Sequence, residues 1–97
     1  MKGHRSWAFI CAFALLAACK LPPDVPEDAR LLYYGPVNDS KQINDILSSD
    51  EINDSPHQVY VYDDEAGKVV EVRTIDAKHR ELNISWLPGH RYRVYIY

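Results

Sequence analysis

The sequence is poor in sulphur-containing residues and in phenylalanine. Its two cysteines, one methionine and two phenylalanines all lie within the first nineteen residues, as Cys11, Cys19, Met1, Phe9 and Phe13. The rest of this sequence therefore has no thiol, which excludes an internal disulfide, a cysteine nucleophile and a cysteine metal ligand there. The four glycines are scattered, so a glycine-rich phosphate-binding loop is missing as well.

A segment near the start of the chain, residues 7–18, has no charge. No charged residue lies between Trp7 and Ala18, and this apolar run follows the basic residues Lys2 and Arg5. A basic start, an apolar run and small residues at its end are typical of a secretory signal peptide. A membrane-spanning helix needs roughly 20 apolar residues. The run has only twelve, so we expect a signal peptide over residues 1–18.

The run ends in Leu16-Ala17-Ala18-Cys19. This segment resembles the lipobox of bacterial lipoproteins. The resemblance implies cleavage before Cys19, lipid attachment to its thiol and acylation of the new N-terminus with a fatty acid such as palmitate. Several acyl chains anchor a protein stably where one does not. The alternative is an ordinary signal peptide with a coincidental cysteine.

The residue after the cysteine bears on location. Lys20 is not the Asp that retains lipoproteins in the inner membrane in the enterobacterial family pattern. The resemblance therefore implies a bacterial cell envelope protein, attached to the outer membrane and facing the periplasm if the source is Gram-negative. Removal of Lys2 and Arg5 would change the net charge from −3 to −5. An acidic domain is a poor partner for nucleic acid, so we expect none.

The segment after the cysteine, residues 19–29, contains Pro22, Pro23 and Pro26 and shows no apolar periodicity. It predicts an extended tether of about 3 Å per residue. Residues 30–97 follow as a small globular domain, with enough chain for one core and not for a second.

The first half of this domain predicts a short strand and a helix. The apolar residues 30–34 end at Gly35-Pro36 and suggest the strand. A helix is expected over residues 40–48, because Ile43, Ile46 and Leu47 form an i, i+3, i+4 stripe. Asp39 and Gln42 have the spacing of a helix capping box.

From His57 onward the apolar period is two, which indicates strands. We expect them over residues 58–62, 68–75, 81–86 and 91–97. Successive hairpins would make a four-stranded antiparallel meander, in an α+β fold that is mainly β. The last strand would be an exposed edge, open to strand addition by another chain.

The final hairpin suggests an alternative fold. Residues 82–96 contain Trp86-Leu87-Pro88-Gly89 followed by Tyr92 and Val94. They resemble the Leu-x-Pro-Gly-x-x-Tyr-x-Val hairpin of fibronectin type III domains. The resemblance implies a small β-sandwich of the immunoglobulin or fibronectin type III kind.

Residues with catalytic or metal-binding chemistry do not form a recognisable pattern. His57, His79 and His90 lie near expected turns and lack the spacing of a metal pair. No serine lies in a nucleophile elbow. Asp63 and Asp64 are read as the polar corner of a hairpin. We therefore expect a non-enzymatic protein without metal or cofactor.

Tyrosine and arginine on the expected strands are the best candidates for a working surface. Both are enriched at interface hot spots, although tyrosine is also simply a good outward strand residue. The predicted partner-binding residues are Tyr60, Tyr62, Arg91, Arg93, Tyr95 and Tyr97. They suggest an accessory or assembly module that binds another envelope protein. The alternatives are a glycan- or peptidoglycan-binding module, since aromatic rings stack on sugars, and a periplasmic inhibitor or exclusion factor.

Overall fold

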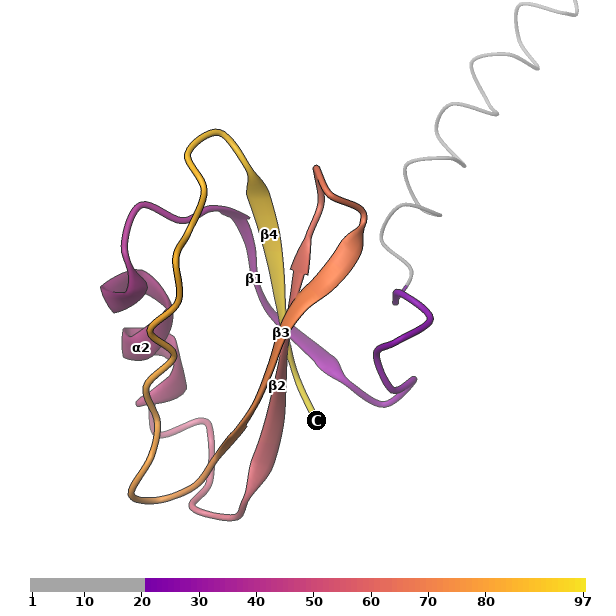
Figure 1. Ribbon diagram of the computed structural model, residues 1–97. Coiled ribbons are helices and arrows are strands. Elements are labelled where there is room, and N and C mark those ends of the chain that lie inside the picture. Colours follow the sequence, from indigo (N-terminus) through magenta and orange to yellow (C-terminus); the bar gives the residue numbers. More distant parts are fainter. Residues whose placement is uncertain (1–20) are drawn as a thin grey trace, which may run out of the picture.

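The computed structural model describes residues 21–97, so Cys19 and the expected signal peptide lie outside the described residues. The described chain forms one open antiparallel sheet of four strands with one short helix, and it is mainly β (Figure 1). The elements are β1 (Arg30–Pro36), α2 (Ser40–Leu47), β2 (His57–Asp63), β3 (Lys68–Ile75) and β4 (Arg91–Ile96). Over residues 21–97, no helix is long and apolar enough to cross a membrane.

The strand order is β1-β4-β2-β3, and all neighbours are antiparallel. The last strand, β4, is therefore central: Arg93 lies opposite Tyr34 of β1 and also opposite Tyr62 of β2. The prediction that the last strand is an exposed edge is wrong, because β1 returns from the start of the domain to cover it. The two edges are β1 and β3.

The strand expected over residues 81–86 is not a strand, and the expected meander order is wrong for the same reason. This segment crosses the sheet beside α2, and side chains of α2 bind it. The Asn44 side-chain oxygen accepts a bond from the Leu82 N–H at 2.7 Å. The Trp86 indole donates to the Ser40 hydroxyl at 2.8 Å. The apolar and polar residues of segment 81–86 thus alternate because one side of this extended segment is buried, and not because the segment pairs with another strand.

The helix prediction is confirmed. α2 begins after Asp39, whose carboxylate accepts a hydrogen bond from the Lys41 N–H at 2.8 Å. The Gln42 side chain accepts in turn from the Asp39 N–H at 3.3 Å, which completes the capping box. Ile43 and Leu47 are buried against the sheet.

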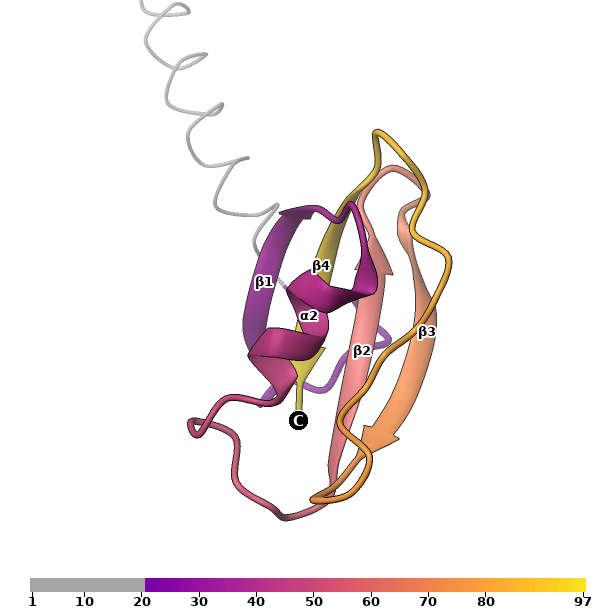
Figure 2. The ribbon, with the colours of Figure 1, turned by 90° about the vertical axis from the view of Figure 1, so that its left-hand side faces the viewer.

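The inner face of the sheet is the face covered by α2 and residues 80–87 (Figure 2). Its core combines side chains of the sheet, of α2 and of the connecting segments: Val37, Ile43, Leu47, Ile52, Val59, Val61, Ile75, Leu82, Tyr92, Val94 and Ile96. Residues 21–97 contain one sheet, so the sandwich alternative, which requires two, has no support.

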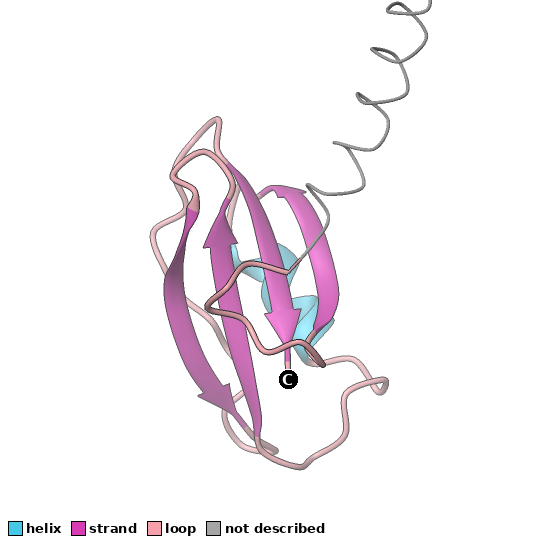
Figure 3. Ribbon diagram, turned by 90° about the vertical axis from the view of Figure 1, so that its right-hand side faces the viewer, coloured by secondary structure: helices cyan, strands magenta, loops and turns pink. Residues whose placement is uncertain are grey.

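The outer face of the sheet is covered by residues 21–29, which we call the N-terminal strap (Figures 1 and 3). The strap turns twice: the Val25 N–H donates to the Pro22 carbonyl, and the Ala29 N–H donates to the Pro26 carbonyl, both at 3.0 Å. Val25 is buried. The described part of the expected tether is therefore folded rather than extended, because proline also suits tight turns and Val25 offers an apolar side chain to bury.

Candidate functional site on the outer face

Strand pairing places two rows of side chains across the outer face. One row is formed by Tyr34 of β1, Arg93 of β4 and Tyr62 of β2. The second row crosses all four strands and contains Leu31, Tyr95, Tyr60 and Val72. Three strands that are distant in sequence thus bring tyrosine and arginine together.

The strap covers the middle of the second row. Tyr95 is 2% exposed and Tyr60 is 9% exposed, and both pack with Val25. The Tyr60 hydroxyl donates to the Gln58 side-chain oxygen at 2.6 Å. These two predicted partner-binding residues lie beneath the strap and do not offer a surface to a partner while it is in place.

The first row forms a cluster that is not covered by the strap and that reaches solvent mainly through Tyr34, while the Arg93 and Asp64 side chains are 12% and 17% exposed. The Arg93 guanidinium carbon lies 5.5 Å from the ring centroid of Tyr34 and 5.3 Å from that of Tyr62. Arg93 pairs with the Asp64 carboxylate at 2.8 Å, and the Tyr34 hydroxyl donates to Asp64 at 3.1 Å. Tyr34 is 51% exposed. We call Tyr34, Tyr62, Asp64 and Arg93 the Tyr–Arg cluster.

The neighbours of Arg93 stabilise its charged form. Burial lowers the pKa of Arg93, but a hydrogen bond with Tyr95 and the charge of Asp64 outweigh burial and raise the pKa overall. Two aromatic rings facing one guanidinium add cation–π attraction. The cluster is therefore a fixed ion pair of Arg93 and Asp64, with the guanidinium lying between two rings.

Arg91 extends this surface along β4. Its N–H donates to one Glu65 carboxylate oxygen at 2.8 Å, and its guanidinium pairs with the other at 3.1 Å. The Arg91 N–H is the largest influence on the Glu65 carboxyl and holds its pKa below the usual range, despite partial desolvation. Arg91 is exposed, so an ion pair borders the Tyr–Arg cluster.

Tyr97 lies away from the cluster. Its backbone exchanges two hydrogen bonds with Gln58, at 2.9 and 3.4 Å, near the start of β2. Its side chain is 55% exposed. Of the six predicted residues, Tyr62, Arg91 and Arg93 adjoin one another, Tyr60 and Tyr95 are covered, and Tyr97 is separate.

Tyr34 was not among the predicted partner-binding residues, although it is the most exposed member of the cluster. The aromatic run of residues 30–34 indicated a strand, but the sequence did not show which other strand this one pairs with. The β1–β4 pairing joins the two ends of the domain, and no local pattern encodes it.

Asp63 and His90 form a second cluster of titratable groups. The buried Asp63 carboxylate accepts hydrogen bonds from the N–H groups of Glu65 and Ala66 at 2.9 and 3.0 Å. His90 Nδ1 lies 2.8 Å from the other oxygen. Burial raises the pKa of Asp63, but the Ala66 N–H and His90 outweigh it and lower the pKa overall. One oxygen accepts both N–H groups of the β2–β3 turn, which confirms the interpretation of Asp63 as a turn residue, and the other oxygen faces His90.

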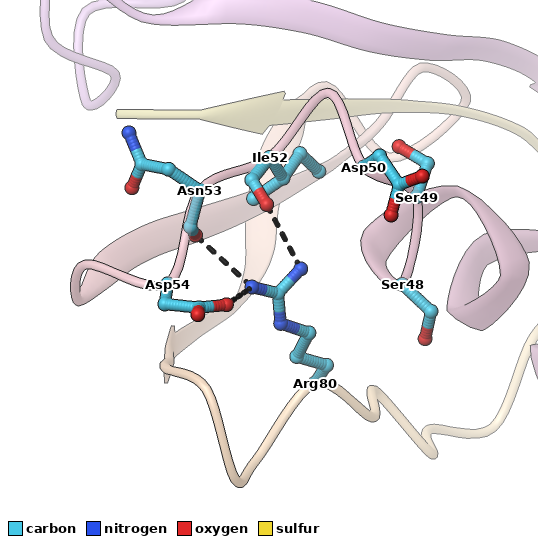
Figure 4. Close-up of a pocket in the computed structure, with 7 residues that line it drawn as sticks. All are labelled: Ser48, Ser49, Asp50, Ile52, Asn53, Asp54 and Arg80. Atoms are coloured by element: carbon cyan, nitrogen blue, oxygen red, sulfur yellow. Dashed lines mark hydrogen bonds and ion pairs between the residues drawn. The ribbon is translucent and has the colours of Figure 1, made fainter.

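An open pocket of about 400 Å³ lies beside Arg80 (Figure 4). The Arg80 guanidinium donates to the carbonyls of Leu47, Ile52 and Asn53 and pairs with Asp54 at 2.6 Å. These bonds join the end of α2 to the acidic loop of residues 48–56, so Arg80 has a structural role. Within residues 21–97, no group of three His, Cys, Asp or Glu side chains could hold a metal ion.

Comparison with known proteins gives no relative for this chain. No family model, no curated protein and no solved structure matches it.

Proposed function

We propose that this protein is a lipid-anchored, non-enzymatic envelope protein that binds another protein through the open part of its outer face. The binding surface consists of the Tyr–Arg cluster and Arg91. The observation that carries the proposal is the Arg93 guanidinium held between the rings of Tyr34 and Tyr62. The lipid anchor rests on the resemblance of Leu16–Cys19 to a lipobox.

The geometry of the cluster favours binding for two reasons. Arg93 is already fixed by two rings and by Asp64, so little side-chain freedom remains to be lost on association. Tyr34 still exposes half of its surface, and tyrosine buries a large area while keeping a polar end. A partner would cover Tyr34 and meet the Arg91–Glu65 pair at the border.

The test compares two tyrosines of matched exposure, Tyr34 at 51% and Tyr97 at 55%. A photo-crosslinking amino acid is placed at each position of the full chain in intact cells. We expect a defined protein adduct from position 34 and much less from position 97. Tyr34→Ala should then reduce recovery of that protein about tenfold, a typical loss for a hot-spot residue, while Tyr97→Ala should not.

Other outcomes separate the remaining candidates. Retention on purified sacculi that depends on Tyr34, without a protein adduct, would favour a glycan- or peptidoglycan-binding module. An adduct with an enzyme or uptake protein whose activity falls on binding would indicate an inhibitor or exclusion factor. Equal adducts from both positions would refute the assignment to the Tyr–Arg cluster.

The anchor has a separate test. Cys19→Ser should abolish labelling by a palmitate analogue and release the protein from the membrane fraction, or stall its processing. Cys11→Ser is the control and should leave the label unchanged, because Cys11 lies within the segment expected to be removed. Membrane retention of the Cys19→Ser protein without label would mean that the apolar segment itself is the anchor.

A further inference from the structure

One edge of the sheet has the features of a pairing site for a second strand. β3 lies at this edge, and β2 is its one neighbour in the sheet of residues 21–97 (Figure 3). The other edge, β1, ends at Pro36, which has no N–H to donate. Each edge strand has one irregularity, between Leu31 and Tyr33 in β1 and at Val70 in β3, so the regular part of β3 begins at Glu71. An edge with unpaired backbone groups is a template for another chain.

The regular part of β3 alternates charge and valine. Glu71 and Arg73 lie opposite Val61 and Val59 of β2 and so share the inner side of the sheet. Within the strand their carboxylate and guanidinium form an ion pair. Val72, between them, lies opposite Tyr60 on the outer side and is 47% exposed.

The pleat restricts how two copies of β3 could pair. In a two-fold symmetric antiparallel pair, residue i faces residue j and j faces i. A continuous sheet keeps side chains of one face together, so only residues on the same side can face each other. Each permitted register is then centred on one residue that faces its own copy.

Charge selects among the three central registers. A centre at Glu71 places two glutamates opposite each other, and a centre at Arg73 does the same with two arginines, which is destabilising. A centre at Val72 places Val72 opposite Val72 and Glu71 opposite Arg73 on both sides. Together with the ion pair inside each strand, this register makes a square of four alternating charges.

We propose that two copies of this protein join through β3, centred on Val72, so that the two four-stranded sheets form one continuous sheet. The joined strands would place the two Val72 side chains in contact on the outer side. The Glu71 and Arg73 side chains of the two copies would pair on the inner side. The Tyr–Arg cluster includes no residue of β3, so this arrangement does not require it to be covered.

Disulfide trapping tests the register. Directly opposed Cα atoms in an antiparallel pair lie about 4.5–5.5 Å apart, within the range that a disulfide spans. Val72→Cys in the full chain, oxidised mildly in intact cells, should therefore give a dimer on a non-reducing gel. Thr74→Cys is the matched control: its two copies would be roughly 13 Å apart along the strands and should not join. The parent chain, with Cys11 and Cys19, gives the background.

Charge reversal tests the pairing independently. In the Val72→Cys chain, Glu71→Arg places arginine opposite Arg73 on both sides and should reduce dimer yield about tenfold. Combining Glu71→Arg with Arg73→Glu restores opposite charges and should restore the dimer. A role that is only protective, in which charge keeps the edge strand from pairing, predicts the reverse: no dimer from the parent charges.

Three results would overturn the proposal: no dimer from Val72→Cys, equal dimer from Thr74→Cys, or failure of the double reversal to restore pairing while the protein remains folded by circular dichroism. An adduct of Val72→Cys with a different protein, and none with itself, would also overturn it and would assign the edge to another partner. These results are separate from the Tyr34 experiment, because that surface does not include β3.

Discussion

The inner face of the sheet is covered by α2 and residues 80–87, whereas the outer face is covered only by the nine-residue strap, 21–29. The inner core contains eleven buried residues from the sheet, the helix and the connecting segments. The outer cluster contains three: Val25, Tyr60 and Tyr95. The stabilising free energy from burying apolar side chains is proportional to the apolar area buried. Most of the hydrophobic stabilisation therefore comes from the inner face.

The inner face thus provides most of the stability of the fold, whereas the outer face provides the candidate binding surface. The inner face is closed, and its polar partners, such as Asn44 and Ser40, bind the covering segment. The outer face is only partly closed, and Leu31, Tyr34 and Val72 remain about half exposed on either side of the strap. Substitutions on the inner face should therefore lower the free energy of unfolding most, while those on the outer face should lower it less and change exposure or binding. The following predictions test this contrast.

The largest effect is expected from Leu82→Ala. Leu82 is fully buried in the inner core although its segment is not a strand. Its removal should lower the free energy of unfolding by about 3 kcal/mol, measured by denaturant titration. Leu87→Ala, in the same segment but 50% exposed, should cost less than about 0.5 kcal/mol. Equal losses would mean that residues 80–87 do not pack on the sheet.

Arg80→Ala should come next. It removes the hydrogen bonds to the carbonyls of Leu47, Ile52 and Asn53, from a side chain that is 16% exposed. The expected loss is about 2–3 kcal/mol, because three carbonyls, two of them partly buried, lose a charged donor. Arg80→Lys should recover little, since one ammonium cannot reach all three carbonyls. Lys78→Ala, at an exposed position, is the control, and recovery by lysine would contradict the multi-carbonyl role.

Asp63→Asn should lower the free energy of unfolding by about 2 kcal/mol at neutral pH, because the bonds to the turn lose their charge and an NH2 group replaces the oxygen that faces His90. The pKa of Asp63 is lowered in the folded protein. Its charge therefore stabilises the fold above about pH 4, the ordinary value, and this contribution is lost as the pH falls through the folded pKa. The free energies of unfolding of the parent protein and of Asp63→Asn are measured by denaturant titration at several pH values. The difference between them should become smaller as the pH falls. A constant difference would contradict the assignment.

Val25→Ala tests the strap. Loss of two buried methyl groups should lower the free energy of unfolding by about 1.5 kcal/mol. It should also make the segment 21–29 more sensitive to limited proteolysis, because Val25 is its buried contact with Tyr60 and Tyr95. Val70→Ala, at an exposed valine, is the control. Unchanged proteolysis of the strap would show that the rest of the segment suffices to hold it.

The smallest effect is expected from the helix cap. Asp39→Ala should lower the free energy of unfolding by about 1 kcal/mol, because the N-terminal N–H groups of α2 lose their acceptor. Asp39→Asn keeps an oxygen acceptor and should cost only a few tenths of a kcal/mol. Both variants are measured by thermal unfolding. If Asp39→Asn lowers the stability as much as Asp39→Ala does, the negative charge of Asp39 rather than its hydrogen bond to the helix would be responsible for the stabilisation.

Local patterns predicted the local elements of this fold. The Asp39–Gln42 capping box predicted the start of the helix, and the alternation of residues 58–62 and 68–75 predicted the strands β2 and β3. These features depend on residues a few positions apart. The covering segment 81–86 shows the limit, because Leu82 alternates with polar residues as a strand would but is bound by a side chain of α2.

The candidate site was less predictable than the fold. Tyr62 and Arg93 could be placed on outward positions from alternation alone. Their neighbour Tyr34 could not, because it joins them through the pairing of β1 with β4. The covering of Tyr60 and Tyr95 by Val25 was equally hidden, since a proline-rich segment without periodicity gives no sign of where it folds.

Under the proposed anchor on Cys19, the strap would also decide how far the domain stands from the membrane. Leu21 already packs against the outer cluster, and only Lys20 separates it from Cys19. Two residue steps span at most about 7 Å, so a lipid on Cys19 would leave the domain no stalk. The outer face would rest close above the headgroups, and a partner would approach Tyr34 sideways, within the thin layer of solvent along the membrane.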